Sequence, residues 1–134
     1  MEVDCKGVDS IERQDIDELK YISKELSKQT NSVIVTTGKI DVVSFLEETI
    51  LVDRGNEILT NITGTGCMTT SLIGSYAAVT NNMLDAALAG VQSMNIAGEI
   101  AYDKMKKVGG GVGSFKVFLM DAAQNINLPK PIIK

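Results

Sequence analysis

A run of four small residues, Gly64, Thr65, Gly66 and Cys67, stands directly before a long uncharged stretch of the chain. If a helix begins at this run, its first turn offers free backbone N–H groups and the positive end of the helix dipole. Glycines in that turn let a phosphate or a developing oxyanion approach the backbone closely. Residues 64–67 are therefore a candidate site for an anion held by backbone amides.

Cys67 is the candidate catalytic residue of this run. In the first turn of a helix, the local field favours the thiolate form of a cysteine. The position suits a group that accepts a proton from a substrate hydroxyl or orients that hydroxyl. The alternative is that residues 64–67 are a tight turn that holds a small buried cysteine. The chain contains no histidine, which excludes Ser–His and Cys–His nucleophilic pairs and histidine-ligated metal sites.

The run matches neither of the two common glycine-rich phosphate motifs. A Walker A loop has a lysine after its last glycine, and here Cys67 follows Gly66. The dinucleotide motif GxGxxG needs a third glycine, and that position holds Thr69. Anion binding would therefore depend on the start of a helix and on its bare amides.

Thr37 is the second candidate site residue. It follows a β-branched run over 32–36, and ligands of open α/β sheets collect at the carboxyl ends of strands. Its hydroxyl could donate a hydrogen bond to a phosphate. The alternative is a turn that Thr37 caps and in which Gly38 has a positive φ.

Two further features, a glycine-rich segment and three aspartates, are weaker indications of a functional site. The glycine-rich segment 109–115, GGGVGSF, is either a mobile loop that covers a flat ligand such as adenine or an uncommitted linker. Asp41, Asp53 and Asp85 have turn-like surroundings, and we interpret them as solvated or capping residues.

The elements that must position these residues begin with a helix over 11–29, capped by Asp9 or Ser10. Its apolar positions recur at three- and four-residue steps: Ile16, Leu19, Ile22 and Leu26. A buried strand over 32–38 follows, and three short runs then predict a meander of strands, 42–46, 49–53 and 57–60. Helix followed by buried strand indicates an α/β fold.

The second half of the chain is predicted to be mostly helical. The helix that opens at Gly64 runs to about Val79, and a second long helix covers 83–107. Both are poor in charge and are expected to be buried on much of their circumference. After a loop over 108–115, a final helix capped by Ser114 places four apolar residues on one face, although a strand is an alternative: Phe115, Phe118, Leu119 and Ala122. The tail 127–134 is expected to be irregular.

Composition favours a single α/β domain over residues 1–134, with 44% apolar and 22% charged residues. The net charge of −4 argues against a nucleic-acid surface. We expect no membrane association, because no basic amphipathic helix, signal-peptide pattern or apolar span of about 20 residues occurs. Two cysteines, Cys5 and Cys67, are too few for a disulfide framework, which favours a reduced, cytoplasmic protein.

Four segments in this order resemble the C-terminal part of hydroxyethylthiazole kinases, the thiazole-salvage enzymes of thiamine biosynthesis: KGVDS, VIVTTGKID, NITGTGCMTTSLIGSYAA and GGGVGSFKVFLMDA. The resemblance runs over nearly the whole chain. It implies a ribokinase-like fold, of which this sequence would form the C-terminal portion of a helix-flanked central sheet.

The resemblance also implies roles for the site residues. Residues 64–67 would form an anion hole. Gly64 would contact the thiazole alcohol, Thr37 would bind ATP, and Cys67 would occupy the position where many relatives have an aspartate base. The implied reaction transfers the γ-phosphoryl group of ATP to the hydroxyl of 4-methyl-5-(2-hydroxyethyl)thiazole, with Mg²⁺ bridging the phosphates. Family members often form trimers with active sites at subunit interfaces, which makes a homo-oligomer a candidate assembly.

Family members are markedly longer than this sequence of 134 residues. Their preceding half brings much of the thiazole pocket, an NxxE segment with Mg²⁺-associated acids and an ATP-contacting arginine. We therefore expect no metal ligands in this chain and little or no kinase activity from it alone. Two alternatives stay open: a non-catalytic segment that binds nucleotide or pairs with a separate N-terminal half, and another ribokinase-like kinase acting on a pyrimidine or sugar alcohol.

Overall fold

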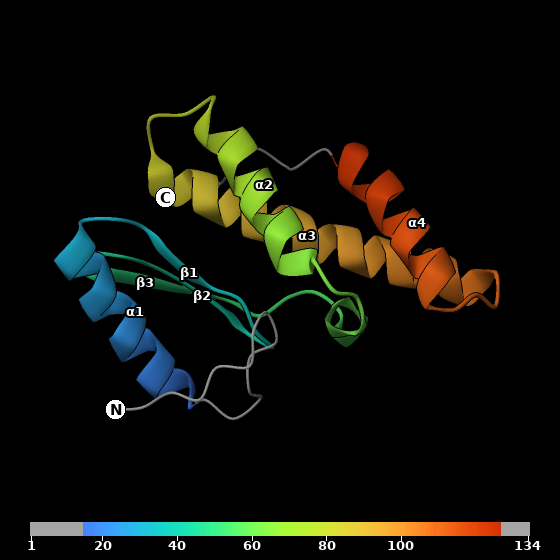
Figure 1. Ribbon diagram of the computed structural model, residues 1–134, viewed down its shortest axis with the longest axis horizontal. Coiled ribbons are helices and arrows are strands. Elements are labelled where there is room, and N and C mark those ends of the chain that lie inside the picture. Colours follow the sequence, from blue (N-terminus) through green and yellow to red (C-terminus); the bar gives the residue numbers. More distant parts are fainter. Residues whose placement is uncertain (1–14, 127–134) are drawn as a thin grey trace.

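The structure is a computed structural model and describes residues 15–126. It consists of a small antiparallel sheet with one helix on its outer side and a group of helices on the other side (Figure 1). The elements in chain order are α1 (Ile16–Thr30), β1 (Ile34–Thr36), β2 (Asp41–Phe45), β3 (Glu48–Val52), the 3₁₀ helix η1 (Glu57–Asn61), α2 (Thr65–Ala77), α3 (Met83–Lys107) and α4 (Val112–Gln124). Helix and strand together confirm the expected α/β class.

The sheet is a meander in the order β1-β2-β3. In the central strand β2, the neighbouring residues Val42 and Val43 are both 0% exposed. Side chains of successive strand residues point to opposite faces, so both faces of β2 are covered. Val43 packs with Ala87 and Val91 of α3, and α1 covers the opposite face. A meander was predicted, but residues 57–60 are not part of it, because they form η1 with Asn56 as the cap.

Helix α1 begins later and buries a different face than the sequence pattern predicts. Its N-cap is Asp15, whose Oδ1 accepts a hydrogen bond from the Asp17 amide, so the predicted caps at Asp9 or Ser10 are wrong; both lie outside the described residues. The residues that face the sheet are Ser23 and Ser27. The Ser23 hydroxyl lies 3.1 Å from the Thr36 hydroxyl.

The apolar face of α1 was predicted to be its buried side, and this prediction is wrong. Small serines line the buried side instead, and they bring the helix close to the sheet. Ser27 donates to the carbonyl of Ser32 and accepts from the amide of Leu46, so it ties the helix to both ends of the strand region. Ile22 and Leu26 are instead 36% and 42% exposed. The sequence therefore predicted the helix correctly, but it did not predict which side of the helix is buried.

Strand β1 is shorter and less buried than predicted. Only Ile34–Thr36 form it, and all three residues are half-buried. The strand lies at the edge of the sheet and pairs through Thr36 with Val42 and through Ile34 with Ser44.

Helix α3 contacts the sheet, η1, α2 and α4. Its bounds match the predicted helix over 83–107, and Asn82 caps it by accepting from the amides of Leu84 and Asp85. Its first half packs on the sheet and on α2, and the rest of the helix packs against η1, the start of α2 and α4 in a cluster that contains Met94, Ala97 and Phe115. The predicted burial of α3 on much of its circumference is therefore confirmed.

Helices α2 and α4 differ in part from the prediction. In α2 only Thr69 is buried, because this helix packs closely on α3 alone. The prediction that α2 is buried on much of its circumference is therefore wrong.

The last segment, α4, is a helix and not a strand, and it buries Phe115, Leu119 and Ala122. Its N-cap is Gly111 rather than Ser114, which shortens the preceding loop. The predicted irregular tail over 127–134 lies outside the described residues. Within 15–126, no helix has the length and apolar character to cross a membrane.

Candidate functional site

Residues 64–67 lie at the N-terminus of α2, as predicted. Gly64 is the N-cap with φ 102°, a conformation that a residue with a side chain rarely adopts. The Met68 amide bonds to the Gly64 carbonyl at 2.9 Å, so the amides of Thr65, Gly66 and Cys67 precede the first intrahelical bond. A Cβ added at Gly64 or Gly66 would meet no other atom of residues 15–126 within 4 Å. The backbone is therefore open to a ligand on this side.

Cys67 is exposed, which contradicts the alternative of a small buried cysteine. Thr65 is oriented by its own side chain, whose hydroxyl lies 3.3 Å from the Leu59 carbonyl of η1. The 3₁₀ helix therefore holds the start of α2 while Gly66 and Cys67 face solvent. An exposed thiol at a helix N-terminus can accept or orient a proton of a ligand that reaches it.

Thr37 is exposed and directly follows the last residue of β1. Its neighbour Thr36 uses its hydroxyl toward Ser23. The following Gly38 is not among the residues with positive φ, so the alternative turn geometry predicted for it is wrong. The Gly38 amide instead donates to Oδ1 of Asp41 at 3.0 Å, which closes the turn 37–41.

Asp41 was interpreted as solvated or capping, and the structure bears out only the second. Its carboxylate caps the turn by accepting from the Gly38 amide, but the residue is only 6% exposed, because the turn folds it against α3. Its Oδ2 accepts a hydrogen bond of 2.7 Å from Nδ2 of Asn95. Burial raises the pKa of the Asp41 carboxyl above its ordinary value, and the hydrogen bonds from Asn95 and Gly38 offset part of that rise. Asp53 is exposed, and Asp85 lies in the first turn of α3.

One helical turn beyond Asn95, Glu99 holds a second loop. Its carboxylate accepts from the Gly55 amide at 3.0 Å and from Nη2 of Arg54 at 2.7 Å. The pKa of Glu99 is lowered chiefly by the hydrogen bond from Arg54. A Cβ on Gly55 would lie 2.9 Å from Oδ1 of Asn95, so this loop passes directly over the helix. Neither Asn95 nor Glu99 was predicted.

The turn 37–41, the loop at Gly55 and the start of α2 therefore meet the same middle stretch of α3. The turn is joined to it through Asn95, the loop through Glu99, and the first turns of α2 through Met68, which packs on the cluster of Met94 and Ala97. Strands β1 and β3 run in the same direction, so their carboxyl ends share this side of the sheet. Figure 1 shows η1 and the start of α2 on that side.

The glycine-rich segment is mostly not a loop. Residues 112–115 form the first turn of α4, and Phe115 is fully buried in the helical cluster. Only 108–111 connect the two helices, with Gly109 at φ 63°. Covering of an adenine by this segment stays a prediction.

The described residues contain no preformed cluster of metal-ligating side chains. Over 15–126, no three or more Asp, Glu, Cys or His side chains are grouped so that they could hold a metal ion. Asp41 has both carboxylate oxygens engaged by Gly38 and Asn95.

Comparisons with known proteins agree with the architecture. The chain is 45% identical to a hydroxyethylthiazole kinase of Clostridium tetani over 129 residues, which are 94% of this chain and 46% of that protein. It is 43% identical to one from Alkaliphilus oremlandii, over 91% of this chain and 44% of the relative. The chain therefore spans less than half the length of these relatives.

A solved hydroxyethylthiazole kinase protein from Pyrococcus horikoshii superposes with a TM-score of 0.76 at 36% identity, over 83% of this chain and 42% of that one. This likeness agrees with the ribokinase-like fold expected from the resemblance. The model of the hydroxyethylthiazole kinase family matches residues 1–128. Because that match includes both the 37–41 turn and the start of α2, the sequence and the geometry agree: the chain belongs to the hydroxyethylthiazole kinase family.

Proposed function

We propose that this chain is the part of an ATP-dependent kinase that holds the transferred phosphoryl group while the hydroxyl of 4-methyl-5-(2-hydroxyethyl)thiazole attacks it, in thiamine salvage or biosynthesis. The observation that carries the proposal is the open, glycine-capped N-terminus of α2 at Gly64, on the same stretch of α3 as the turn after β1. Family membership supports the reaction, since the relatives are named for it.

In this proposal each site residue has a separate task. The amides of residues 65–67 stabilise the charge on the phosphoryl oxygens, a contribution of about 2.7–4 kcal/mol per donor in comparable oxyanion sites. Gly64 borders the thiazole alcohol, and Thr37 donates its hydroxyl to a phosphate of ATP. Cys67 accepts or orients the proton of the attacking hydroxyl. A loose transition state for phosphoryl transfer demands positioning more than a strong base.

The remaining tasks are assigned to the other half of the family's chain. Mg²⁺ is expected with ATP, but the described residues of this chain do not fit it, so its ligands would come from that half. We expect little or no turnover by the 134-residue chain alone. A cytoplasmic location and a homo-oligomer belong to the same proposal.

The test is a thiazole-kinase assay with three samples. They are this chain alone, this chain co-expressed with the part of the Clostridium tetani kinase that lies outside the match, and the intact Clostridium tetani kinase as a positive control. We expect thiazole phosphate from the second and third samples only. A complex that forms but makes no phosphate ester, beside an active control, would contradict the proposed reaction.

The second candidate function is a segment that binds nucleotide or assembles without catalysis. The observation that favours it is the coverage of less than half of each compared relative. ATP binding by the co-expressed complex without phosphate transfer to the thiazole would select this candidate over the kinase.

A further inference from the structure

Asp41 and Asn95 form a polar pair in the interior between the sheet and α3. Each residue is only 6% exposed, and among the described residues 15–126 Asp41 is the one buried residue whose side chain can carry a charge. A buried carboxylate loses its hydration, which costs free energy unless its partners compensate for the loss. Apolar groups of the same shape in place of both partners often leave a protein equally stable. The pair is therefore a candidate for a role besides stability.

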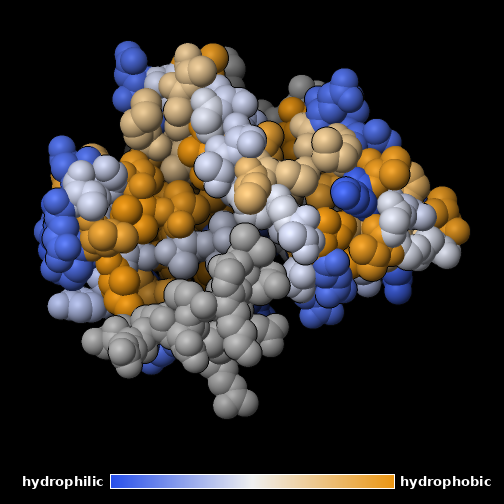
Figure 2. Space-filling view, in the orientation of Figure 1, coloured by the Kyte–Doolittle hydropathy of each residue, from blue (hydrophilic) through white to orange (hydrophobic). Residues whose placement is uncertain are grey.

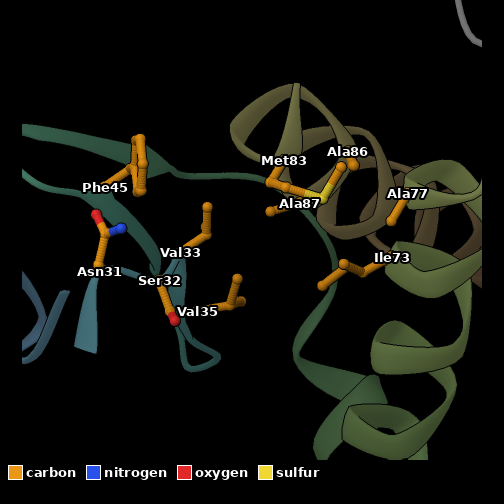
Figure 3. A pocket seen from close by; sticks show the side chains of 10 residues that line it. All are labelled: Asn31, Ser32, Val33, Val35, Phe45, Ile73, Ala77, Met83, Ala86 and Ala87. Atoms are coloured by element: carbon orange, nitrogen blue, oxygen red, sulfur yellow. The ribbon is translucent and has the colours of Figure 1, made fainter. Parts of the chain in front are cut away.

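The strand that leads into the turn 37–41 is anchored on both of its faces. Thr36 points to α1, where its hydroxyl lies 3.1 Å from the Ser23 hydroxyl. Val35 lines a groove of about 390 Å³ on the opposite face, and Ile73 lines the same groove from α2 (Figure 3). Figure 2 shows hydrophobic surface between the sheet and the helices. The end of β1 is therefore held by its own side chains.

The turn 37–41 has no such anchors before its last residue. Thr37 and Gly38 are exposed. In the described chain this turn makes two hydrogen bonds outside the strand ladder, and Asp41 accepts both of them. One comes from the Gly38 amide at 3.0 Å, and the other comes from Nδ2 of Asn95 at 2.7 Å. The path of the exposed turn is therefore set from α3 through one carboxylate.

Asn95 is itself held in place by the loop before η1. The Gly55 backbone lies against its side chain, and a Cβ added at Gly55 would lie 2.9 Å from Oδ1 of Asn95. The Glu99 carboxylate accepts from the Gly55 amide at 3.0 Å and keeps the loop in this position. A side chain covered in this way has little rotamer freedom, and supports of this kind keep binding groups at fixed positions. Asn95 therefore offers Asp41 a donor at a fixed position.

We propose that Asn95 is a positioning residue of the nucleotide site, which through Asp41 holds the exposed turn in the conformation in which Thr37 meets a phosphate of ATP. This role rests on the proposed function, because Thr37 is the ATP contact there. Asn95 itself does not touch the nucleotide. It removes conformational freedom that the turn would otherwise lose on binding. Loss of this support weakens ATP binding, and phosphoryl transfer is not needed to detect the effect.

An exchange of the two side chains separates their hydrogen bonds from their shape. Asp41→Asn alone leaves one amide donor without an acceptor, and Asn95→Asp alone brings two carboxylates together. In the double variant, the amide at position 41 accepts from Gly38 through its oxygen and donates to the carboxylate at position 95. Every group then has a partner again. Recovery should be incomplete, because the new carboxylate lies one turn from Glu99.

The test follows the amide NMR signals of Thr37 and Gly38 in the full 134-residue chain during titration with ATP and Mg²⁺. One sample is the chain alone, and the other is the chain co-expressed with the part of the Clostridium tetani kinase outside the match. We expect ATP to shift both signals in the wild type. The affinity should fall about tenfold in Asp41→Asn and in Asn95→Asp, and it should return to within about threefold of wild type in the double variant.

Ser93→Ala is the matched control on the same helix. Ser93 is 2% exposed, and its hydroxyl lies 2.8 Å from that of Tyr76, so this variant also removes a hydrogen bond of a buried α3 side chain. That bond joins α3 to α2 and not to the turn. We expect Ser93→Ala to lower the thermal midpoint and to leave the ATP affinity unchanged. A pair that only stabilises the fold would give the same ATP affinity in all the variants.

Four results would overturn the positioning role of Asn95. They are wild-type ATP affinity in both single variants, no recovery in the double variant, an equal loss of ATP affinity in Ser93→Ala, and signals of Thr37 and Gly38 that ATP does not shift in either wild-type sample. Formation of thiazole phosphate tests the proposed function separately. The expected order of ATP affinities, without phosphate ester from the wild-type complex, would support the role of Asn95 and contradict the reaction.

Discussion

Asn95 of α3 donates a hydrogen bond of 2.7 Å to Asp41, at the amino end of β2, and thereby joins the central helix to the turn that follows β1. The other oxygen of Asp41 accepts from the Gly38 amide inside that turn. One buried carboxylate therefore sets both the shape of the turn and its distance from α3. Thr37, the proposed ATP contact, is carried by this turn, so its position depends on a pair of residues that need not touch nucleotide.

Asp41→Asn should destabilise the protein by about 1–3 kcal/mol, because an amide facing the Asn95 amide leaves a buried donor without an acceptor. The penalty should also depend on pH. A raised pKa in the folded state means that Asp41 stabilises most when protonated, and this part is lost as the pH rises from about 4 through the raised value. The difference between wild type and variant should therefore shrink with rising pH. Urea unfolding between pH 4 and 7 measures it, and a difference that grows with pH would contradict the assignment.

Glu99→Gln should show the opposite pH dependence. The pKa of Glu99 is lowered in the folded state, so its contribution is present above about pH 4.3 and is lost as the pH falls through the lowered value. Because the pair with Arg54 is partly exposed, we expect a loss of up to about 1 kcal/mol near neutral pH. Glu48→Gln, an exposed strand position, is the control. Equal effects of the two substitutions in urea unfolding would show that Glu99 does not hold the loop at Gly55.

Replacing glycine by alanine should have opposite effects on stability at Gly90 and at Gly74. A Cβ at Gly90 would clash with Cγ1 of Ile73 and lie 2.7 Å from its Cα, so Gly90→Ala must push α2 away from α3. We expect a loss of about 1–3 kcal/mol. Gly74 meets nothing within 4 Å, and Gly74→Ala should stabilise α2 by up to about 1 kcal/mol. Thermal unfolding of both variants is the measurement. A neutral Gly90→Ala would mean that the two helices are not in close contact there.

Elements with local signals were predictable from the sequence, and contacts between distant elements were not. The α3 helix was predicted at its observed bounds because the polar residues 80–82 interrupt the preceding helix and the residues from 83 are poor in charge up to the final lysines. The start of α2 was also predictable from a local signal, the glycine at Gly64 directly before an uncharged stretch. Asn95 and Glu99 carry no local signal, since a polar residue within a helix is usually solvated. Only the folded chain brings two loops over them.

Burial was misjudged where side-chain size mattered more than polarity. Ser23 and Ser27 face the sheet because they are small and hydrogen-bond the strand region, while Leu26 is left 42% exposed. Residues 57–60 have a strand-like composition, but Asn56 caps them into η1. Asp41 resembles a turn residue in sequence, and only the proximity of α3 makes it buried.

The role proposed for Cys67 can be decided in an active complex that contains this chain. Cys67 is exposed in the first turn of α2, so a carboxylate at this position has no desolvation cost and is favoured by the helix dipole. If the side chain accepts or orients the substrate proton, Cys67→Asp should keep activity and the thermal midpoint. Cys67→Ala should lower kcat more than it raises KM for ATP.

The expected loss in Cys67→Ala is modest, about tenfold to a hundredfold in kcat, because a loose transition state needs little help from a base. Ser75→Ala, two turns later on α2 and also exposed, is the matched control and should be silent. Steady-state kinetics with varied ATP and thiazole, together with thermal unfolding, separate the effects. An alanine variant equal to wild type, beside an inactive but folded aspartate variant, would remove Cys67 from the chemistry and leave the amides of residues 65–67 as the sole contribution of this turn.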